Sequence, residues 1–253
     1  MEMVPGVHRV EKLRGGNAYL LADARLTLID TGMPGGAPRV LSYIRSLGRE
    51  PEELDHIFIT HGHMDHAGAA AELRRLTGAR LVAHRDEGVR TPDGALVLRG
   101  DPNGEAGLLV RAMSRLGRFE PCPVDWAVSD GDLVPCAGGM RVVHTPGHTR
   151  GSISLLLEKR SILFAGDAII SNRDRLSRPL PFGTDRAESE RSLARLAQLG
   201  FDVCCFGHGP ALTSDAREAV AALAASPPKT PLWQRIAFRR GDLARFGVRM
   251  FKE

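Results

Sequence analysis

The chain has 253 residues, of which 43% are hydrophobic and 25% charged, a composition that supports a globular core and excludes disorder or a fibrous repeat. Its net charge of +4 arises from 30 Arg and 4 Lys interleaved with 30 acidic residues, which predicts a solvated surface and no nucleic-acid partner. No apolar run reaches the roughly 20 residues of a membrane span, and the first residues do not resemble a signal peptide. Because the four cysteines lack Cys-x-x-Cys spacing, we expect a protein of the reducing cytoplasm.

The first third of the chain predicts two strands and then an alternation of helices and strands. The strands cover 17–23 and 26–30, and the helix that follows, over 39–47, ends at a glycine. A buried strand, a second helix and a further strand come next, over 57–60, 67–76 and 80–83. This alternation requires helices that cover a sheet.

The middle of the chain, over about 86–123, is rich in turn-forming residues and predicts a surface insertion with one helix over 105–116. Regular elements resume as strands over 126–128, 140–144, 153–157 and 161–164, a helix over 188–199, a strand over 203–206 and a helix over 215–225. The tail over about 229–253 is predicted to dock on the domain, with a homodimer contact or a membrane contact as alternatives. We expect one domain over 1–253.

The motif that carries chemistry is His61-Gly62-His63-Met64-Asp65-His66, which follows a buried strand and opens a helix. Extended residues two apart point the same way, so His61 and His63 can converge beyond the strand end. Three imidazoles and a carboxylate within six positions are typical of a metal site, not of a core. Histidine and carboxylate ligands without thiolate suit zinc, but also iron, manganese or cobalt.

Three further strand ends carry metal-ligand residue types. His148 lies in Thr145-Pro-Gly-His, Asp167 follows a glycine, and His208 lies between two glycines. Each one alone is compatible with an ordinary turn. Together with the first motif they exceed what one ion requires, which argues for two ions.

These motifs resemble those of the metallo-β-lactamase-fold hydrolase superfamily over about residues 7–212. The matching residues are His61, His63, Asp65 and His66; Thr145 to Gly151; Gly166-Asp167; and Gly207-His208. The resemblance implies an α/β fold, a four-layer αββα sandwich with two metals at one edge between the sheets. It further implies one metal on His61, His63 and His148, a second on Asp65, His66 and His208, a bridging Asp167, and a supporting Asp30 outside the ligand set.

A water shared by two divalent cations is deprotonated near neutral pH and attacks a carbonyl or phosphorus, and Asp65 can orient it or pass a proton to the leaving group. Several branches of the family fit poorly. Zinc β-lactamases have Cys or Ser at or near the position of Asp167, and flavodiiron enzymes have Glu in place of the second histidine. Acyl-homoserine lactonases use a tyrosine between the bridging aspartate and the last histidine, whereas the two tyrosines of this sequence, Tyr19 and Tyr43, both precede Asp167. Glyoxalase II enzymes carry a larger C-terminal domain, and RNA-processing relatives carry an additional one.

We therefore predict a di-metal hydrolase, expected to hold zinc, that cleaves a small ester, lactone or thioester. A phosphodiesterase and a mononuclear-iron dioxygenase are the alternatives. The insertion and the loop over 171–186 are predicted to form the substrate pocket, with Arg173, Arg175 or Arg178 pairing with an anionic group and Phe182 adding an apolar wall. For these arginines a solvated loop is the competing interpretation.

Overall fold

The computed structural model describes residues 1–98, 119–172, 175–179 and 185–228. The helix predicted over 105–116, the tail over 229–253 and the side chains of Arg173 and Phe182 lie outside these ranges. Within the described ranges, no helix is both long enough and apolar enough to span a bilayer.

The first half of the chain forms a seven-stranded sheet in the order β1-β2-β3-β4-β5-β6-β10. Neighbouring strands are antiparallel from β1 to β4 and parallel from β4 to β10. The strands are β1 Glu2–Val4, β2 Val7–Arg9, β3 Tyr19–Ala22, β4 Leu26–Ile29, β5 Leu54–Phe58, β6 Arg80–His84 and β10 Trp126–Val128.

The second half forms a five-stranded sheet in the order β11-β12-β13-β14-β17. It is antiparallel except that β14 and β17 run parallel. The strands are β11 Leu133–Val134, β12 Met140–His144, β13 Ile153–Leu157, β14 Ile162–Gly166 and β17 Val203–Phe206.

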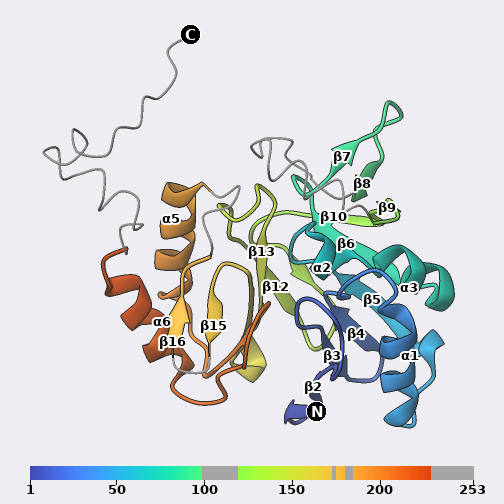
Figure 1. Ribbon diagram of the computed structural model, residues 1–253, viewed down its shortest axis with the longest axis horizontal. Helices are drawn as coiled ribbons and strands as arrows, with labels where there is room; N and C mark the ends of the chain where they lie inside the picture. Colours follow the sequence, from blue (N-terminus) through green and yellow to red (C-terminus); the bar gives the residue numbers. More distant parts are fainter. Residues whose placement is uncertain (99–118, 173–174, 180–184, 229–253) are drawn as a thin grey trace, which may run out of the picture.

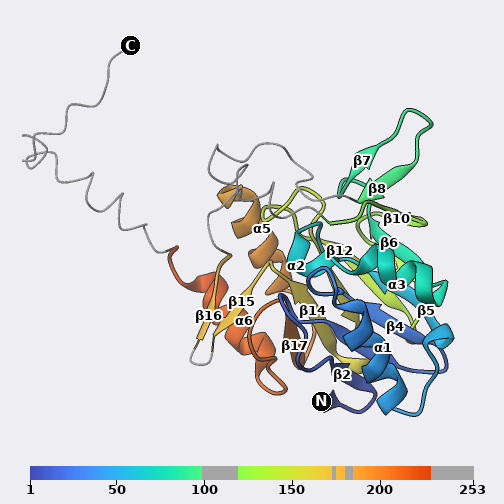
Figure 2. The same cartoon turned by 45° about the vertical axis from the view of Figure 1, so that its right-hand side comes forward.

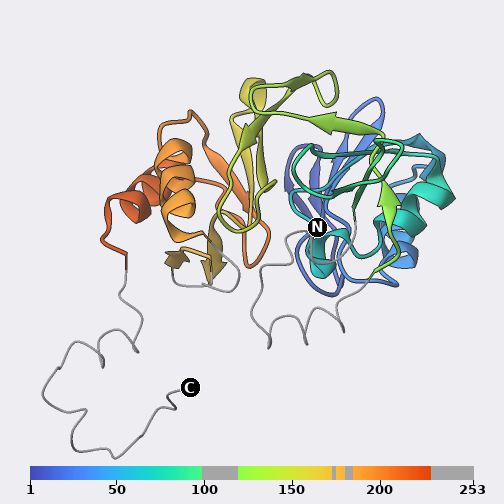
Figure 3. The ribbon, with the colours of Figure 1, turned by 90° about the horizontal axis from the view of Figure 1, so that it is seen from above.

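Helices cover the outer face of each sheet (Figure 1, and from above in Figure 3). Val40 and Ile44 of α1 (Ala37–Ser46) and Leu73 of α3 (Ala70–Thr77) pack against the first sheet. Leu193 of α5 (Arg186–Leu196) and Val220 of α6 (Ala216–Ala225) pack against the second. Among the described residues, the remaining helical elements are α2 Met64–Ala67, η1 Pro51–Glu53 and η2 Glu158–Arg160. The predicted αββα sandwich is confirmed.

A third core layer fills the space between the sheets. Ile29 and Phe58 of the first sheet meet Val142 and Phe164 of the second there. The alternation of a strand separates the adjacent cysteines of β17, because Cys205 faces this layer whereas Cys204 faces the helices.

The helix predicted over 67–76 is divided into α2 and α3. The break falls at Gly68, where a Cβ would lie 2.3 Å from the carbonyl oxygen of Met64 and 2.4 Å from Pro34 Cδ. The side chain of Thr31 accepts the backbone N–H of Ala69 and donates to the carbonyl of His66, so it fixes the end of the short helix. The predicted metal-binding motif, His61 to His66, therefore ends in a short helix of its own, separate from α3.

Two small sheets occupy stretches predicted as loops. The first is β7-β8-β9, with β7 Val89–Arg90, β8 Leu96–Leu98 and β9 Cys122–Pro123, and the β7–β8 hairpin projects beside β6 and β10 (Figure 2). The second pairs β15 Ile170–Asn172 with β16 Arg175–Ser177. Strands of two or three residues are too short to show a period, so the sequence pattern does not reveal them.

Candidate metal centre

All seven predicted ligands lie at one edge of the two sheets. His61 follows β5 in the first sheet, whereas His148, Asp167 and His208 follow β12, β14 and β17 in the second. Strands that run in the same direction end at the same edge, so loops far apart in sequence meet there.

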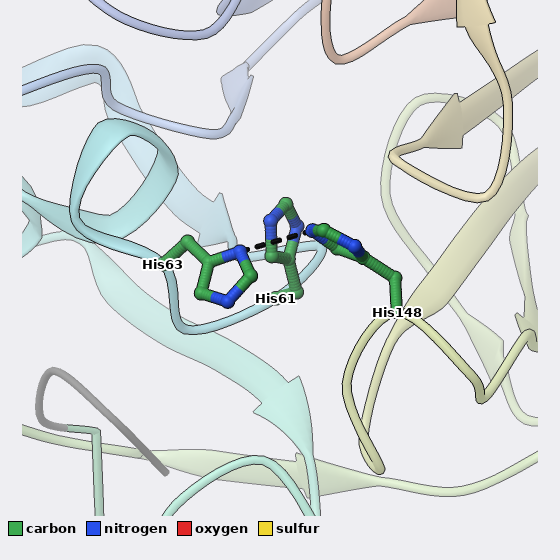
Figure 4. Close-up of side chains that lie close together, drawn as sticks. All are labelled: His61, His63 and His148. Atoms are coloured by element: carbon green, nitrogen blue, oxygen red, sulfur yellow. Dashed lines mark hydrogen bonds between the residues drawn. The ribbon is translucent and has the colours of Figure 1, made fainter. Parts of the chain in front are cut away.

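Three histidines form one group in which each ring stands nearly perpendicular to the others (Figure 4). The ring centroids of His61 and His63 are 4.7 Å apart, and those of His63 and His148 are 4.6 Å apart. The closest nitrogens are His63 Nδ1 and His148 Nε2, at 2.9 Å.

Asp65, His66 and His208 form a second group. The Nε2 atoms of His66 and His208 are 3.2 Å apart, and Asp65 Oδ2 lies 3.2 Å from His208 Nε2. His66 is fully buried, whereas Asp65 and His208 keep about a third of their side-chain surface exposed, at 32% and 36%.

Asp167 lies between the two groups. Its Oδ2 is 3.5 Å from His148 Nε2 and 3.4 Å from His208 Nε2, and its Oδ1 is 3.6 Å from His66 Nε2. The carboxylate therefore faces both groups at once.

These distances fit a metal. Two nitrogens that each bind a tetrahedral zinc at its usual bond length lie about 3.3 Å apart, and the paired ligand atoms here are 2.9 to 3.7 Å apart. The Nε2 of His61 and the Oδ1 of Asp167 are buried and make no hydrogen bond with the described part of the chain. Buried polar atoms are rarely left without a partner, and a cation would supply one.

The electrostatics of the site follow from the close packing of like groups. Burial and the neighbouring imidazoles hold the pKa of His61 well below its usual range. Burial also works against the charged form of His66, but Asp167, Asp30 and Asp65 outweigh it and raise the pKa of His66 to about 10. Burial raises the pKa of Asp167. Without a metal, these carboxylates and imidazoles share protons among themselves, and a bound cation would take the place of those protons.

Asp30 forms hydrogen bonds with His66 and with Thr60, the residue before His61. Its Oδ2 lies 2.9 Å from His66 Nδ1 and accepts the hydroxyl of Thr60, while its Oδ1 accepts the backbone N–H of Thr60. Its φ of +59° is uncommon for a residue other than glycine. The orientation of His66 toward the cluster thus depends on a residue outside it.

Sequence reasoning missed Glu87, which is fully buried directly beside the ligand loops. Its carboxylate accepts hydrogen bonds from the backbone of Gly62 and Gly151 and from the hydroxyl of Thr149. Burial raises its pKa to about 7, although these three donors act in the opposite direction. Its position just past the end of β6, as His61 lies past the end of β5, was the available signal.

Gly207 shows why small residues precede the ligands. A Cβ at this position would lie 2.0 Å from Asp167 Oδ1 and 2.9 Å from His66. Only glycine lets the backbone before His208 pass this close to the cluster.

The predicted substrate residues have different surroundings. Arg178 donates to Glu190 at 2.6 Å and to the backbone oxygen of Ser226 at 2.7 Å, so it ties α5 to the end of α6. Arg175 is exposed on β16. The apolar side chains of Phe119, Trp126 and Leu176 each pack on a core layer.

A further group of metal-ligand residue types, formed by His84, Asp86 and His144, lies where β6 and β12 end. The two imidazoles stack with centroids 4.0 Å apart and planes at 11°. His84 Nδ1 accepts the backbone N–H of Asp86, and His144 Nε2 lies 2.8 Å from the carbonyl of Arg150. Burial and the neighbouring His144 lower the pKa of His84 to about 4.

The family sequence model of the metallo-beta-lactamase superfamily matches residues 12–208 of this chain. The chain belongs to this superfamily. The αββα sandwich and the histidine-rich edge between its sheets are therefore those of a metallo-beta-lactamase superfamily member.

Individual relatives agree with this assignment. A probable metallo-hydrolase of Bacillus subtilis, YflN, is 28% identical over 84% of this chain and 87% of its own length. A hydroxyacylglutathione hydrolase of Rhodopseudomonas palustris is 30% identical over 63% of this chain, which spans only half the length of that relative. A metallo-beta-lactamase family protein of Thermus thermophilus superposes with a TM-score of 0.68 at 26% identity, covering 88% of this chain and 80% of the other.

Proposed function

We propose that this superfamily member is a di-metal hydrolase that cleaves a small ester, lactone or thioester. Its family and its relatives make it a metal-dependent hydrolase. Zinc is the metal we propose, because it binds imidazoles and carboxylates, the donors present here. Iron and manganese accept the same donor set. One metal would be held by His61, His63 and His148, the other by Asp65, His66 and His208, with Asp167 between them.

The observation that carries the proposal is the placement of Asp167 against both groups, within 3.4 to 3.6 Å of His148, His208 and His66. A carboxylate in this position could contact two ions, one in each group. Two metals when bound would supply an activated water and a Lewis acid for the carbonyl oxygen.

The residues of the chain divide the remaining tasks. Asp65 is the acidic member of the cluster with exposed surface. Burial acts to raise its pKa, but the hydrogen bond with His208 and the charge of His66 outweigh this and hold the pKa well below its usual range. It is therefore ionised at neutral pH and can accept a proton from the attacking water and pass it to the leaving group. The buried His61 and His66 close the inner side of the site to solvent.

The substrate class is a small molecule with an acyl carbon. One relative is named for hydrolysing an acyl group carried by glutathione. Because this chain spans half of that relative, we extend only the acyl chemistry to it and not the glutathione. All four cysteines are free and buried, as expected in the reducing cytoplasm, which we propose as the location.

Metal analysis and a substrate panel test this proposal. We expect about two zinc ions per chain and activity of the zinc-loaded protein on lactone or thioester substrates. One iron per chain would favour an oxidoreductase instead, and activity confined to phosphodiesters would favour that alternative. Loss of activity with a chelator and its return with zinc would link the metal to the reaction.

A further inference from the structure

Glu87 joins the two loops that carry the three-histidine group. One oxygen accepts from the backbone of Gly62, which lies between His61 and His63. The other accepts from the hydroxyl of Thr149, the residue after His148, at 2.7 Å and from the backbone of Gly151 at 2.9 Å. A single side chain thus contacts a loop of the first sheet and a loop of the second.

The fit around Glu87 is close on all sides. The side chain is fully buried, and its own backbone N–H donates to the carbonyl of His84 at 2.9 Å. A Cβ at position 151 would lie 2.5 Å from Glu87 Cβ, so only glycine allows the second loop to approach. Neither loop can shift along Glu87 without breaking a hydrogen bond in a place without access to water.

Metal affinity is sensitive to such shifts. Ligand distances must stay within about 0.2 Å of their preferred values, and the nitrogens of His63 and His148 come from opposite loops. The residue that fixes the separation of the loops also fixes the separation of these ligands.

We propose that Glu87 is a positioning residue that sets the distance between the His61–His63 pair and His148, and thereby the affinity of this group for its metal. The inference rests on the proposed function, since it requires that the group holds a metal. The contacts by which Glu87 acts are those with the backbone N–H groups of Gly62 and Gly151 and with the hydroxyl of Thr149.

The test is a metal titration of the full chain with Glu87→Gln. An amide keeps the shape of the side chain, but its NH₂ faces at least one of the three donors whichever way it turns. We expect one of two cobalt or zinc binding steps to weaken by about 10- to 100-fold. The visible spectrum of the cobalt protein at that step should change, and the other step should remain as in the wild type.

Two further variants make the result specific. Thr149→Val removes one donor without a change in shape, and its affinity for the same step should fall about fivefold. Asp125→Asn is the matched control, because Asp125 also joins two segments, accepting from Arg74 and from the backbone of Leu81, but contacts neither ligand loop. It should lower the melting temperature of the metal-free protein and leave both binding steps unchanged.

The outcomes separate the two proposals. If Glu87→Gln and Thr149→Val titrate like the wild type, the inference is overturned and the proposed function stands. The inference is also overturned if Asp125→Asn weakens metal binding as much as Glu87→Gln, since any loss of stability would then suffice. Wild-type protein that binds no metal would overturn the proposed function and the inference with it.

Discussion

Two sets of histidines near strand ends, one of His61, His63 and His148 and the other of His84 and His144, differ in the orientation of their rings. In the group of His61, His63 and His148 the planes meet at 75° to 87°, whereas His84 and His144 stack at 11°. The lone pair of an imidazole lies in the ring plane. Rings at steep angles can direct their lone pairs to one point, but stacked rings cannot. Proximity of ligand types is therefore not enough to identify a metal site.

The largest effect should follow from Asp167→Ala, which removes the carboxylate that faces both the three-histidine group and the group of Asp65, His66 and His208. We expect metal content to fall below two ions per chain and kcat/KM to fall by about 10³-fold or more, as several kcal/mol of transition-state stabilisation are lost. Metal analysis and kinetics on one preparation would measure both. A variant that kept its full metal content and activity would remove Asp167 from the proposed site.

A smaller effect is expected when the support of one ligand is changed. Asp30→Asn keeps the shape but weakens the contact with His66 Nδ1, now 2.9 Å. Metal affinity should fall by about 10- to 100-fold, measured by competition with a chromophoric chelator. Unchanged affinity would mean that the packing around His66 is sufficient to orient its ring.

The stacked pair should respond to pH and not to metal. His84 has a folded-state pKa of about 4 and an unfolded one of about 6.5, so the unfolded chain binds more protons between these values and stability is lost as pH falls. Between pH 7 and pH 5 the loss amounts to about 2 kcal/mol of unfolding free energy.

His84→Phe keeps an aromatic ring and removes this titration. Denaturant unfolding of the metal-free variant should show that much less pH dependence than the wild type, while its metal content stays at two ions. A loss of metal on this substitution would contradict the distinction drawn from ring orientation.

The smallest effect is expected where neither group is touched. Arg178→Met removes the ion pair with Glu190 and the hydrogen bond to Ser226, both half-buried. We expect a loss of about 1–2 kcal/mol in unfolding free energy and no change in KM for anionic esters. A raised KM would instead restore this arginine to the substrate site.

The layers of the fold and the gathering of the seven ligand residues were predictable because their signals are local. Buried strands such as β5 and β14 appear as short apolar runs, and His61, Asp167 and His208 each lie within three residues of the end of one. Glu87 and the stacked pair were not predictable in the same way. The contacts of Glu87 and the stacking of His84 on His144 depend on which loops meet across the two sheets. The sequence around a single acidic residue in a turn does not indicate which loops meet.

The strands of β7, β8, β15 and β16 were missed for a different reason. Each has two or three residues and is held by its neighbours and not by its own pattern. The break between α2 and α3 likewise follows from the approach of Pro34 to Gly68, a contact between segments more than 30 residues apart in sequence.

The candidate ligands come from both halves of the sandwich: His61 and His63 from the loop after β5, Asp65 and His66 from α2, and three from the segments after β12, β14 and β17. Ions held there would link the two halves of the sandwich as a cross-link does. Binding to the folded state alone raises the melting temperature with the concentration of free metal. Release of either ion would then require the halves to part, so its exchange rate would report on the opening of the sandwich itself.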